Sequence, residues 1–138
     1  PEIFFKDVGD GYFEVRMPAG LDVVKAKEDN RFDGKITVLS SAANSSGATI
    51  LIALLQDRYG ATVVGEPTGG SSEGPTAGIM LFMKLPASGI TVRIPAIRSW
   101  VNVEHPTPGM GVMPDVVVRP DYESWLAGED KVLEAAMR

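Results

Sequence analysis

The 138-residue chain contains no cysteine and only one histidine. The lack of cysteine excludes thiol catalysis, disulfide bonds and thiolate metal sites, and a single imidazole excludes a metal centre built from several histidines. No apolar run reaches the roughly 18–20 residues of a membrane-spanning helix. The N-terminal residues also lack the basic start and apolar core of a signal peptide. An absence of cysteine suits a periplasmic or secreted protein, which we expect, as well as a cytoplasmic one.

What the chain does contain is ordinary for a soluble globular domain. Hydrophobic residues make up 44% and charged residues 22% of the sequence, and the length suffices for one compact domain with a core. A net charge of -5 argues against nucleic acid or an anionic membrane surface as the main partner.

The middle of the chain predicts a strand–helix–strand unit. Residues 36–39 form a short β-branched run bounded by Gly34 and by small residues, which is typical of a buried strand. The apolar side chains of residues 48–55 cover most of one helix, which Gly60 is expected to end. A helix that is apolar over so wide an arc should be packed between layers. Residues 61–65 (ATVVG) predict the second strand.

The remaining segments predict strands first and helices last. Two strands around a turn at Gly9–Gly11 are followed by a surface loop at 22–35, and the third quarter of the chain predicts an antiparallel meander. The helix at 131–137 should be capped by Asp130. The expected strands are 3–5, 12–17, 79–85, 90–94, 97–103 and 116–118, with a turn at 86–89, and the other expected helix is 122–126.

Two serines directly precede the central helix, and they have two interpretations. Serine is a favoured N-cap, and most serines at that position only cap. Alternatively, Ser46 is a nucleophile beside the unpaired N–H groups of the helix start, with Gly47 donating one hydrogen bond to a developing oxyanion. That second interpretation requires a base to take the hydroxyl proton.

The other polar candidates have plain interpretations as solvated groups. His105 and Glu104 lie in a proline-flanked loop, and Asp57 and Arg58 read as solvated charges at a helix end. The loop at 65–72 has the spacing of a phosphate-binding loop, but a serine stands where the lysine is needed, so nucleotide binding is rejected.

Several segments together resemble the C-terminal-processing and tricorn-type serine peptidases. They are SSGATILIALLQDRYGATVVGEPTGG, LPASGITVRIP, GMGVMPDVVV and GEDKVLEAAMR, in that order. The resemblance extends from about Phe32 to the end, so residues 1–31 are an unassigned lead-in and residues 32–138 are expected to form the C-terminal part of a peptidase catalytic domain.

The resemblance implies roles for particular residues. The nucleophile falls on Ser46, with Ser45 as the adjacent alternative, and Gly47 supplies an oxyanion N–H. The lysine base of the processing branch falls on Ser71, with Ser72 next, so a Ser–Lys dyad is not available. In the tricorn-like branch a histidine comes from earlier sequence, and Glu104 matches the supporting carboxylate.

Two explanations of the missing base follow. Pro1 in place of methionine favours the C-terminal part of a larger peptidase, and the alternative is that His105 swings in as a substitute base. The implied fold is α/β of the crotonase/Clp-like kind, with a helix packed on the sheet and an antiparallel meander. The implied activity is endopeptidase hydrolysis of peptide bonds through an acyl-enzyme.

No metal or organic cofactor is implied, and the expected partner is a peptide or protein substrate, with homo-oligomerisation left open. Two rivals remain. One is a non-catalytic module of the same fold that binds a peptide or apolar ligand. The other is a crotonase-like acyl-transfer protein, which the acidic loop EPTGGSSEG disfavours.

Overall fold

The structure is a computed structural model that describes residues 5–15, 28–76 and 78–138 and divides into two units, residues 1–34 and 35–138. In the first unit, β1 (Phe5–Gly9) and β2 (Tyr12–Val15) pair as an antiparallel hairpin. Its turn at Gly9–Gly11 has positive φ throughout, which confirms the predicted turn. The predicted strand residues 3–4 and 16–17 and the loop residues 22–27 lie outside the described residues.

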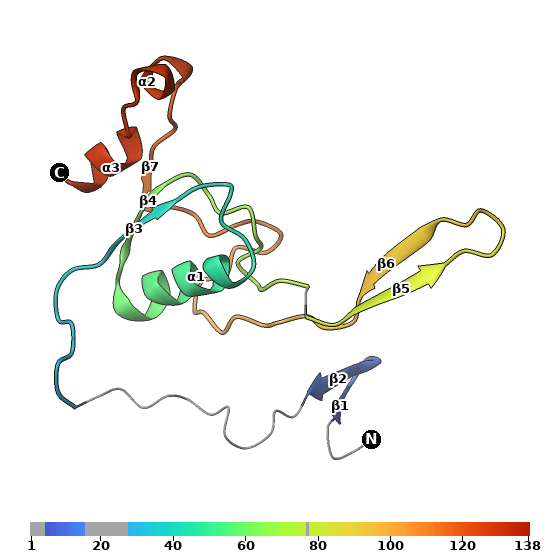
Figure 1. Cartoon of the computed structure of the whole chain (residues 1–138). Helices are drawn as coiled ribbons and strands as arrows, with labels where there is room; N and C mark the ends of the chain where they lie inside the picture. Colours follow the sequence, from blue (N-terminus) through green and yellow to red (C-terminus); the bar gives the residue numbers. More distant parts are fainter. Residues whose placement is uncertain (1–4, 16–27, 77) are drawn as a thin grey trace. The chain divides into compact units, whose positions relative to one another are not determined.

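The second unit contains the predicted strand–helix–strand unit. β3 (Thr37–Ser40), α1 (Gly47–Tyr59) and β4 (Thr62–Gly65) follow one another, and β3 and β4 pair in parallel. β7 (Val116–Val117) adds to the other edge of β4, also in parallel, so the sheet order is β3-β4-β7. Figure 1 shows the three strands side by side. The mixed α/β class is therefore confirmed.

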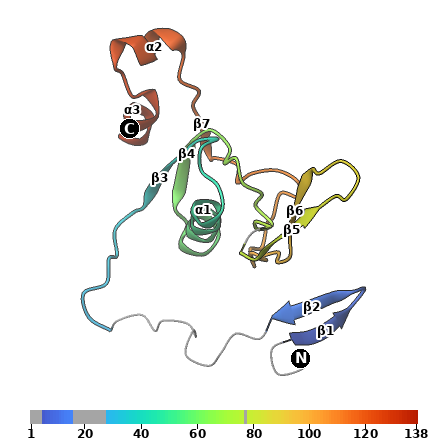
Figure 2. The same cartoon turned by 45° about the vertical axis from the view of Figure 1, so that its right-hand side comes forward.

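Helix α1 ends where the sequence predicts. Gly60 adopts the left-handed conformation with φ of 61°, and its N–H bonds to the Leu55 carbonyl, a common glycine C-cap. The expectation of a helix packed between layers is wrong for this unit. α1 lies against one face of the sheet (Figure 2) and buries Thr49, Ile52 and Ala53, whereas Leu51 stays 57% exposed.

The hydrophobic core lies between α1, β4 and the long segment that leads to β7. Val63 of β4 is fully buried at its centre. The segment between β6 and β7 contributes two valines from parts that form no regular strand. The buried core side chains are Ile52, Ala53, Val63, Val101 and Val112. The segment between β6 and β7, which forms no regular helix or strand, therefore packs against the buried residues of α1.

The antiparallel meander is confirmed only as a hairpin. β5 (Met80–Lys84) and β6 (Thr91–Pro95) pair around the predicted turn at 86–89. The predicted third strand at 97–103 does not form. The Ser99 and Val101 N–H groups donate instead to the Pro75 and Glu73 carbonyls. Gly74 between these acceptors has positive φ and Pro75 has no N–H to offer, which interrupts a regular ladder.

The C-terminal helices are short and capped by aspartates. α2 (Tyr122–Ala127) begins after Asp121, and α3 (Lys131–Ala136) begins after Asp130, whose carboxylate accepts the Leu133 N–H at 2.9 Å as predicted. α3 contacts β3 and β4. Among the helices in the described part of the chain, none has the length and apolarity needed to cross a membrane.

Candidate functional site

Ser46 occupies the position directly before α1 and has an unusual backbone. Its φ of 54° and ψ of -123° lie outside the regions that a non-glycine residue normally adopts, and such strain persists only where surrounding contacts hold it. The Ser46 side chain makes no capping hydrogen bond to the helix. Ser46 therefore stands at the N-cap position without using its hydroxyl as a cap.

Gly47 is the first residue of α1 and directly follows Ser46 in the chain. Two of the next three donors are occupied, since the Ala48 N–H bonds to the Ser45 carbonyl and the Ile50 N–H to the Ser46 carbonyl, both at 3.2 Å. Among the hydrogen bonds of the described residues, none is donated by the Gly47 N–H. In the same part of the chain the Thr49 N–H donates no hydrogen bond either, so the helix start offers two unpaired donors at the positive end of the helix dipole, and the Gly47 N–H is the one adjacent to Ser46 in the chain.

The loop from Gly65 to Gly74 contacts the turn that precedes Ser46. The N–H groups of Gly69 and Gly70 bond to the Asn44 carbonyl at 2.9 and 3.1 Å. At the position where the resemblance places a lysine, Ser71 accepts the Glu73 N–H through its hydroxyl. That hydroxyl stabilises a local turn and supplies no base.

The adjacent Ser72 is buried and joins two loops. Its Oγ donates to the Thr107 carbonyl and accepts both the N–H and the hydroxyl of Thr107, each at 2.9 Å. The Thr107 hydroxyl is shared, because it also reaches the Gly111 carbonyl at 2.8 Å. Thr68 adds a second link, since its N–H and Oγ1 both bond to the backbone of Val112. These bonds fix the segment that carries Glu104 and His105.

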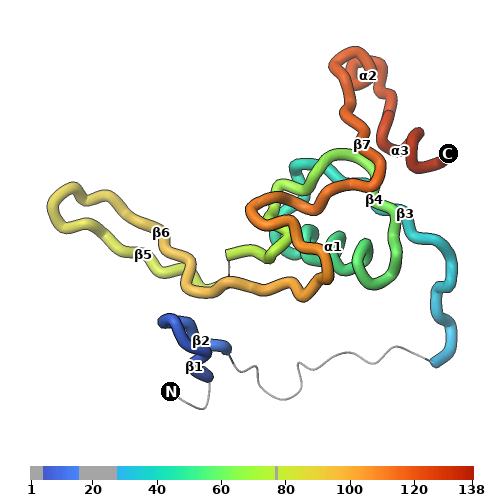
Figure 3. Tube along the Cα trace, turned by 180° about the vertical axis from the view of Figure 1, so that it is seen from behind, coloured from blue at the N-terminus to red at the C-terminus, as the bar shows by residue number. Residues whose placement is uncertain are grey.

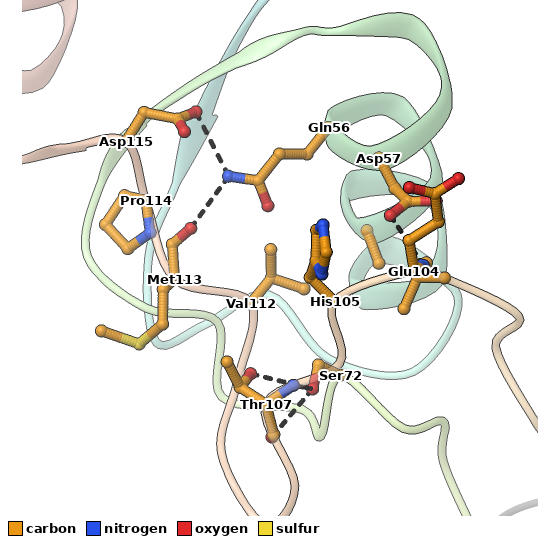
Figure 4. A pocket seen from close by; sticks show the side chains of 12 residues that line it. Gln56, Asp57, Ser72, Glu104, His105, Thr107, Val112, Met113, Pro114 and Asp115 are labelled. Atoms are coloured by element: carbon orange, nitrogen blue, oxygen red, sulfur yellow. Dashed lines mark hydrogen bonds between the residues drawn. The ribbon is translucent and has the colours of Figure 1, made fainter.

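Glu104 and His105 line an open cavity of about 580 Å³ on the C-terminal half of α1. Figure 4 shows the His105 imidazole pointing into this cavity, with Gln56 and Asp57 of α1 on one side and Thr107 and Ser72 below. The Glu104 N–H donates to Asp57 Oδ1 at 2.9 Å. Arg58 likewise donates to the Asn102 carbonyl at 3.0 Å. The prediction that Asp57 and Arg58 are only solvated charges is therefore wrong, because both bond to the segment before β7.

The predicted site residues fall into two places. Ser46 and Gly47 lie at the start of α1, whereas Glu104 is bonded to Asp57, which lies about 16 Å further along the helix axis. Ser46 is not among the described residues that line the cavity. The tube in Figure 3 shows the segment before β7 running alongside α1. The predicted nucleophile and oxyanion donor therefore lie at one end of α1, and Glu104 and His105 lie near the other end.

Sequence reasoning missed two residues that hold the serine turn. Asn44 accepts the bonds from the glycine loop, and its Oδ1 accepts the Ser41 N–H at 2.7 Å. An asparagine between strand and helix is a common turn residue and could have been noticed. Thr49 is fully buried in the first turn of α1, where a hydroxyl within an apolar run was the available signal.

Comparison with known families decides the family. The family model of Peptidase family S41 matches residues 10–118. The chain belongs to this family. S41 members are serine peptidases, so residues 10–118 form a portion of a peptidase catalytic domain. The match begins before Phe32, where the resemblance first became recognisable in the sequence, and it ends at β7.

No curated protein matches the chain. Within the described residues, no group of three or more acidic or histidine side chains is arranged to hold a metal ion.

Proposed function

We propose that the chain is the serine-bearing portion of an endopeptidase catalytic domain of the C-terminal-processing or tricorn-like kind, with Ser46 as the nucleophile. The Ser46 hydroxyl oxygen attacks a peptide carbonyl carbon and gives up its proton to a base. The C–N bond then breaks, the amine leaves with that proton, and water hydrolyses the resulting ester. The Gly47 N–H donates to the oxyanion during both steps.

One observation carries this proposal: the strained backbone of Ser46 combined with a hydroxyl that does not cap α1. An exposed serine at positive φ between a strand and a helix has the position of the nucleophile in a nucleophile elbow. Ser45, the alternative nucleophile, is not among the residues with positive φ. The geometry therefore favours Ser46.

The general base is proposed to be a histidine from residues outside 1–138, with Glu104 as the carboxylate that orients it. Ser71 occupies the lysine position and accepts a backbone N–H, which supports the tricorn-like branch over a Ser–Lys dyad. His105 is the weaker substitute, because its loop is bonded to α1 at Asp57, about three turns from Ser46.

The fold, location and partners follow from the same proposal. A β3-β4-β7 parallel sheet with α1 on one face is compatible with the crotonase/Clp-like arrangement, which we propose for the intact domain. The proposed substrates are peptides or proteins, the proposed location is periplasmic or secreted with the cytoplasm as the alternative, and homo-oligomerisation is left open.

The second candidate is a non-catalytic module that binds a peptide or an apolar ligand. The observation that favours it is the separation of Ser46 from the imidazole and carboxylate of the 104–105 loop, since a serine without a base is inert. The two proposals differ in one chemical property, which is the reactivity of the Ser46 hydroxyl.

Labelling with a fluorophosphonate followed by mass spectrometry tests that property. The test uses residues 1–138 and the full-length gene product side by side. The proposal expects modification of Ser46 in the full-length protein and none in the shorter chain. Modification of neither would contradict the peptidase proposal and support the binding module. Modification of the shorter chain would show that its own residues, His105 first, activate the serine.

A further inference from the structure

Thr49 is a buried polar residue on an apolar helix face. It is fully buried, and its neighbours on that face of α1 are Ile52 and Ala53, which belong to the core. Valine has nearly the same shape and would avoid the cost of desolvating a hydroxyl. The hydroxyl is therefore expected to serve an interaction that valine could not make.

The partner of this hydroxyl lies outside the helix. Thr49 Oγ1 donates to the Asn44 carbonyl at 3.3 Å. A helical threonine usually bonds to a carbonyl three or four residues back, within its own helix. Thr49 instead reaches five residues back, across the turn that contains Ser46, so its bond joins the two sides of that turn.

The Asn44 carbonyl is a junction of three donors. Besides Thr49 it accepts the N–H groups of Gly69 and Gly70. The same residue is fixed from the other side, because its Oδ1 accepts the Ser41 N–H at 2.7 Å. Donors from the helix and from the glycine loop therefore meet at one atom, two residues before Ser46.

The glycine loop is seated closely against this turn. A Cβ on Gly69 would lie 2.1 Å from the Ala42 carbonyl oxygen, and a Cβ on Gly70 would lie 2.4 Å from Thr49 Oγ1. Only glycine permits these approaches. The Thr49 side chain thus packs against Gly70 of the loop, and its hydroxyl donates to the Asn44 carbonyl.

We infer that Thr49 is a positioning residue for the Ser46 nucleophile, an inference that rests on the proposed function. The strained conformation of Ser46 is kept because the Asn44 carbonyl is held from α1 by Thr49 and from the loop by Gly69 and Gly70. Without the Thr49 hydroxyl the turn relaxes, and the Ser46 oxygen moves away from the line of attack while the fold is retained. Thr49 itself does not touch the substrate.

The test compares four variants of the full-length protein by fluorophosphonate labelling at Ser46. Thr49→Val should lower the labelling rate constant roughly ten- to a hundred-fold, the size of effect expected from misplacing a reacting group, with the probe's binding constant and the melting temperature little changed. Thr49→Ser, which keeps the hydroxyl, should restore most of the rate. Thr62→Val, at the exposed first position of β4, is the matched control and should label at the wild-type rate. Ser46→Ala should not label.

The outcomes separate this inference from the proposed function. If Ser46→Ala abolishes labelling but Thr49→Val labels at the wild-type rate, Thr49 is not a positioning residue and the peptidase proposal stands. If Thr49→Val fails to fold, Thr49→Ala repeats the comparison, and failure of both would make Thr49 a residue of the fold only and overturn the inference.

A second readout does not depend on activity. Amide hydrogen exchange at Gly69 and Gly70 should be faster in Thr49→Val than in the Thr62→Val control, because both N–H groups share the Asn44 carbonyl with Thr49. Unchanged exchange would show that Thr49 does not help to hold the Asn44 carbonyl, and it would overturn the inference even in a protein whose serine proved unreactive.

Discussion

The Glu104 N–H donates a 2.9 Å hydrogen bond to Asp57 Oδ1, which joins the loop before β7 to the last turn of α1. An acidic side chain near a helix C-terminus is opposed by the helix dipole. Helix stability therefore does not explain Asp57, whereas its bond to the Glu104 backbone does. Glu104 is placed by α1 as much as by its own loop.

Replacing Asp57 with alanine should loosen that loop. The lost hydrogen bond is exposed, so the free energy of unfolding should fall by about 0.5–1.5 kcal/mol. Asp57→Asn keeps the Oδ1 acceptor and is the matched control, which should unfold at the wild-type urea midpoint or slightly above it. Equal midpoints for the two variants would show that the bond contributes nothing.

Glu104→Gln should lower peptidase activity of the full-length protein, but less than Ser46→Ala does. The amide keeps the shape of the side chain and removes the negative charge that would orient a histidine. The loss should be smaller than the ~10²–10⁴-fold typical of removing a general acid or base. Wild-type kcat/KM in Glu104→Gln would remove this residue from the site.

Asp115 should prove important for stability. Its Oδ2 accepts the N–H of the fully buried Val63 at 2.7 Å and the Gln56 amide at 3.2 Å. In Asp115→Ala the Val63 N–H loses its partner, which should cost about 1–3 kcal/mol of unfolding free energy. Gln56→Ala removes only the exposed partner and should cost clearly less. Urea unfolding of the two variants tests the ranking, and the reverse order would contradict it.

Two glycine-to-alanine substitutions near the turn should have opposite effects on stability. A Cβ at Gly69 would lie 2.1 Å from the Ala42 carbonyl oxygen, and relieving that overlap should cost about 1–3 kcal/mol. At Gly47 nothing lies within 4 Å of an added Cβ, and alanine favours a helix by up to about 1 kcal/mol. Thermal unfolding checks both. A Gly69→Ala protein as stable as wild type would mean that the loop does not press on the turn.

The cap of α2 should be lost in acid. The Ser124 backbone N–H, donated to the carboxylate, lowers the pKa of Asp121. A lowered pKa in the folded protein means that the cap contributes above the ordinary aspartate range and is lost as pH falls through the folded pKa. The Ser124 amide shift in NMR should follow this titration. Asp121→Asn, which also caps, should abolish the pH dependence.

The strand–helix–strand unit could be predicted because its signals are local. Apolar runs set β3 and β4, and Gly60 ends α1. The third meander strand could not be predicted from its own apolar residues. The opposite segment prevents the ladder, because Gly74 has positive φ and Pro75 has no N–H to donate.

The candidate site was predictable in type but not in geometry. The position of Ser46 followed from the order of motifs, whereas its positive φ and the bonds from Gly69 and Gly70 to the preceding Asn44 carbonyl have no local signal in the sequence. The bond between Asp57 and Glu104 spans 47 positions, and no local pattern announces it. Contacts of this kind are set by tertiary packing alone.

The central claim is that Ser46 is an activated nucleophile, and its reactivity in the full-length protein is the most direct test. Fluorophosphonate treatment followed by peptide mass spectrometry should find the adduct on Ser46, with none in Ser46→Ala. An unlabelled Ser46, in a preparation where a known serine hydrolase reacts fully, would contradict the account.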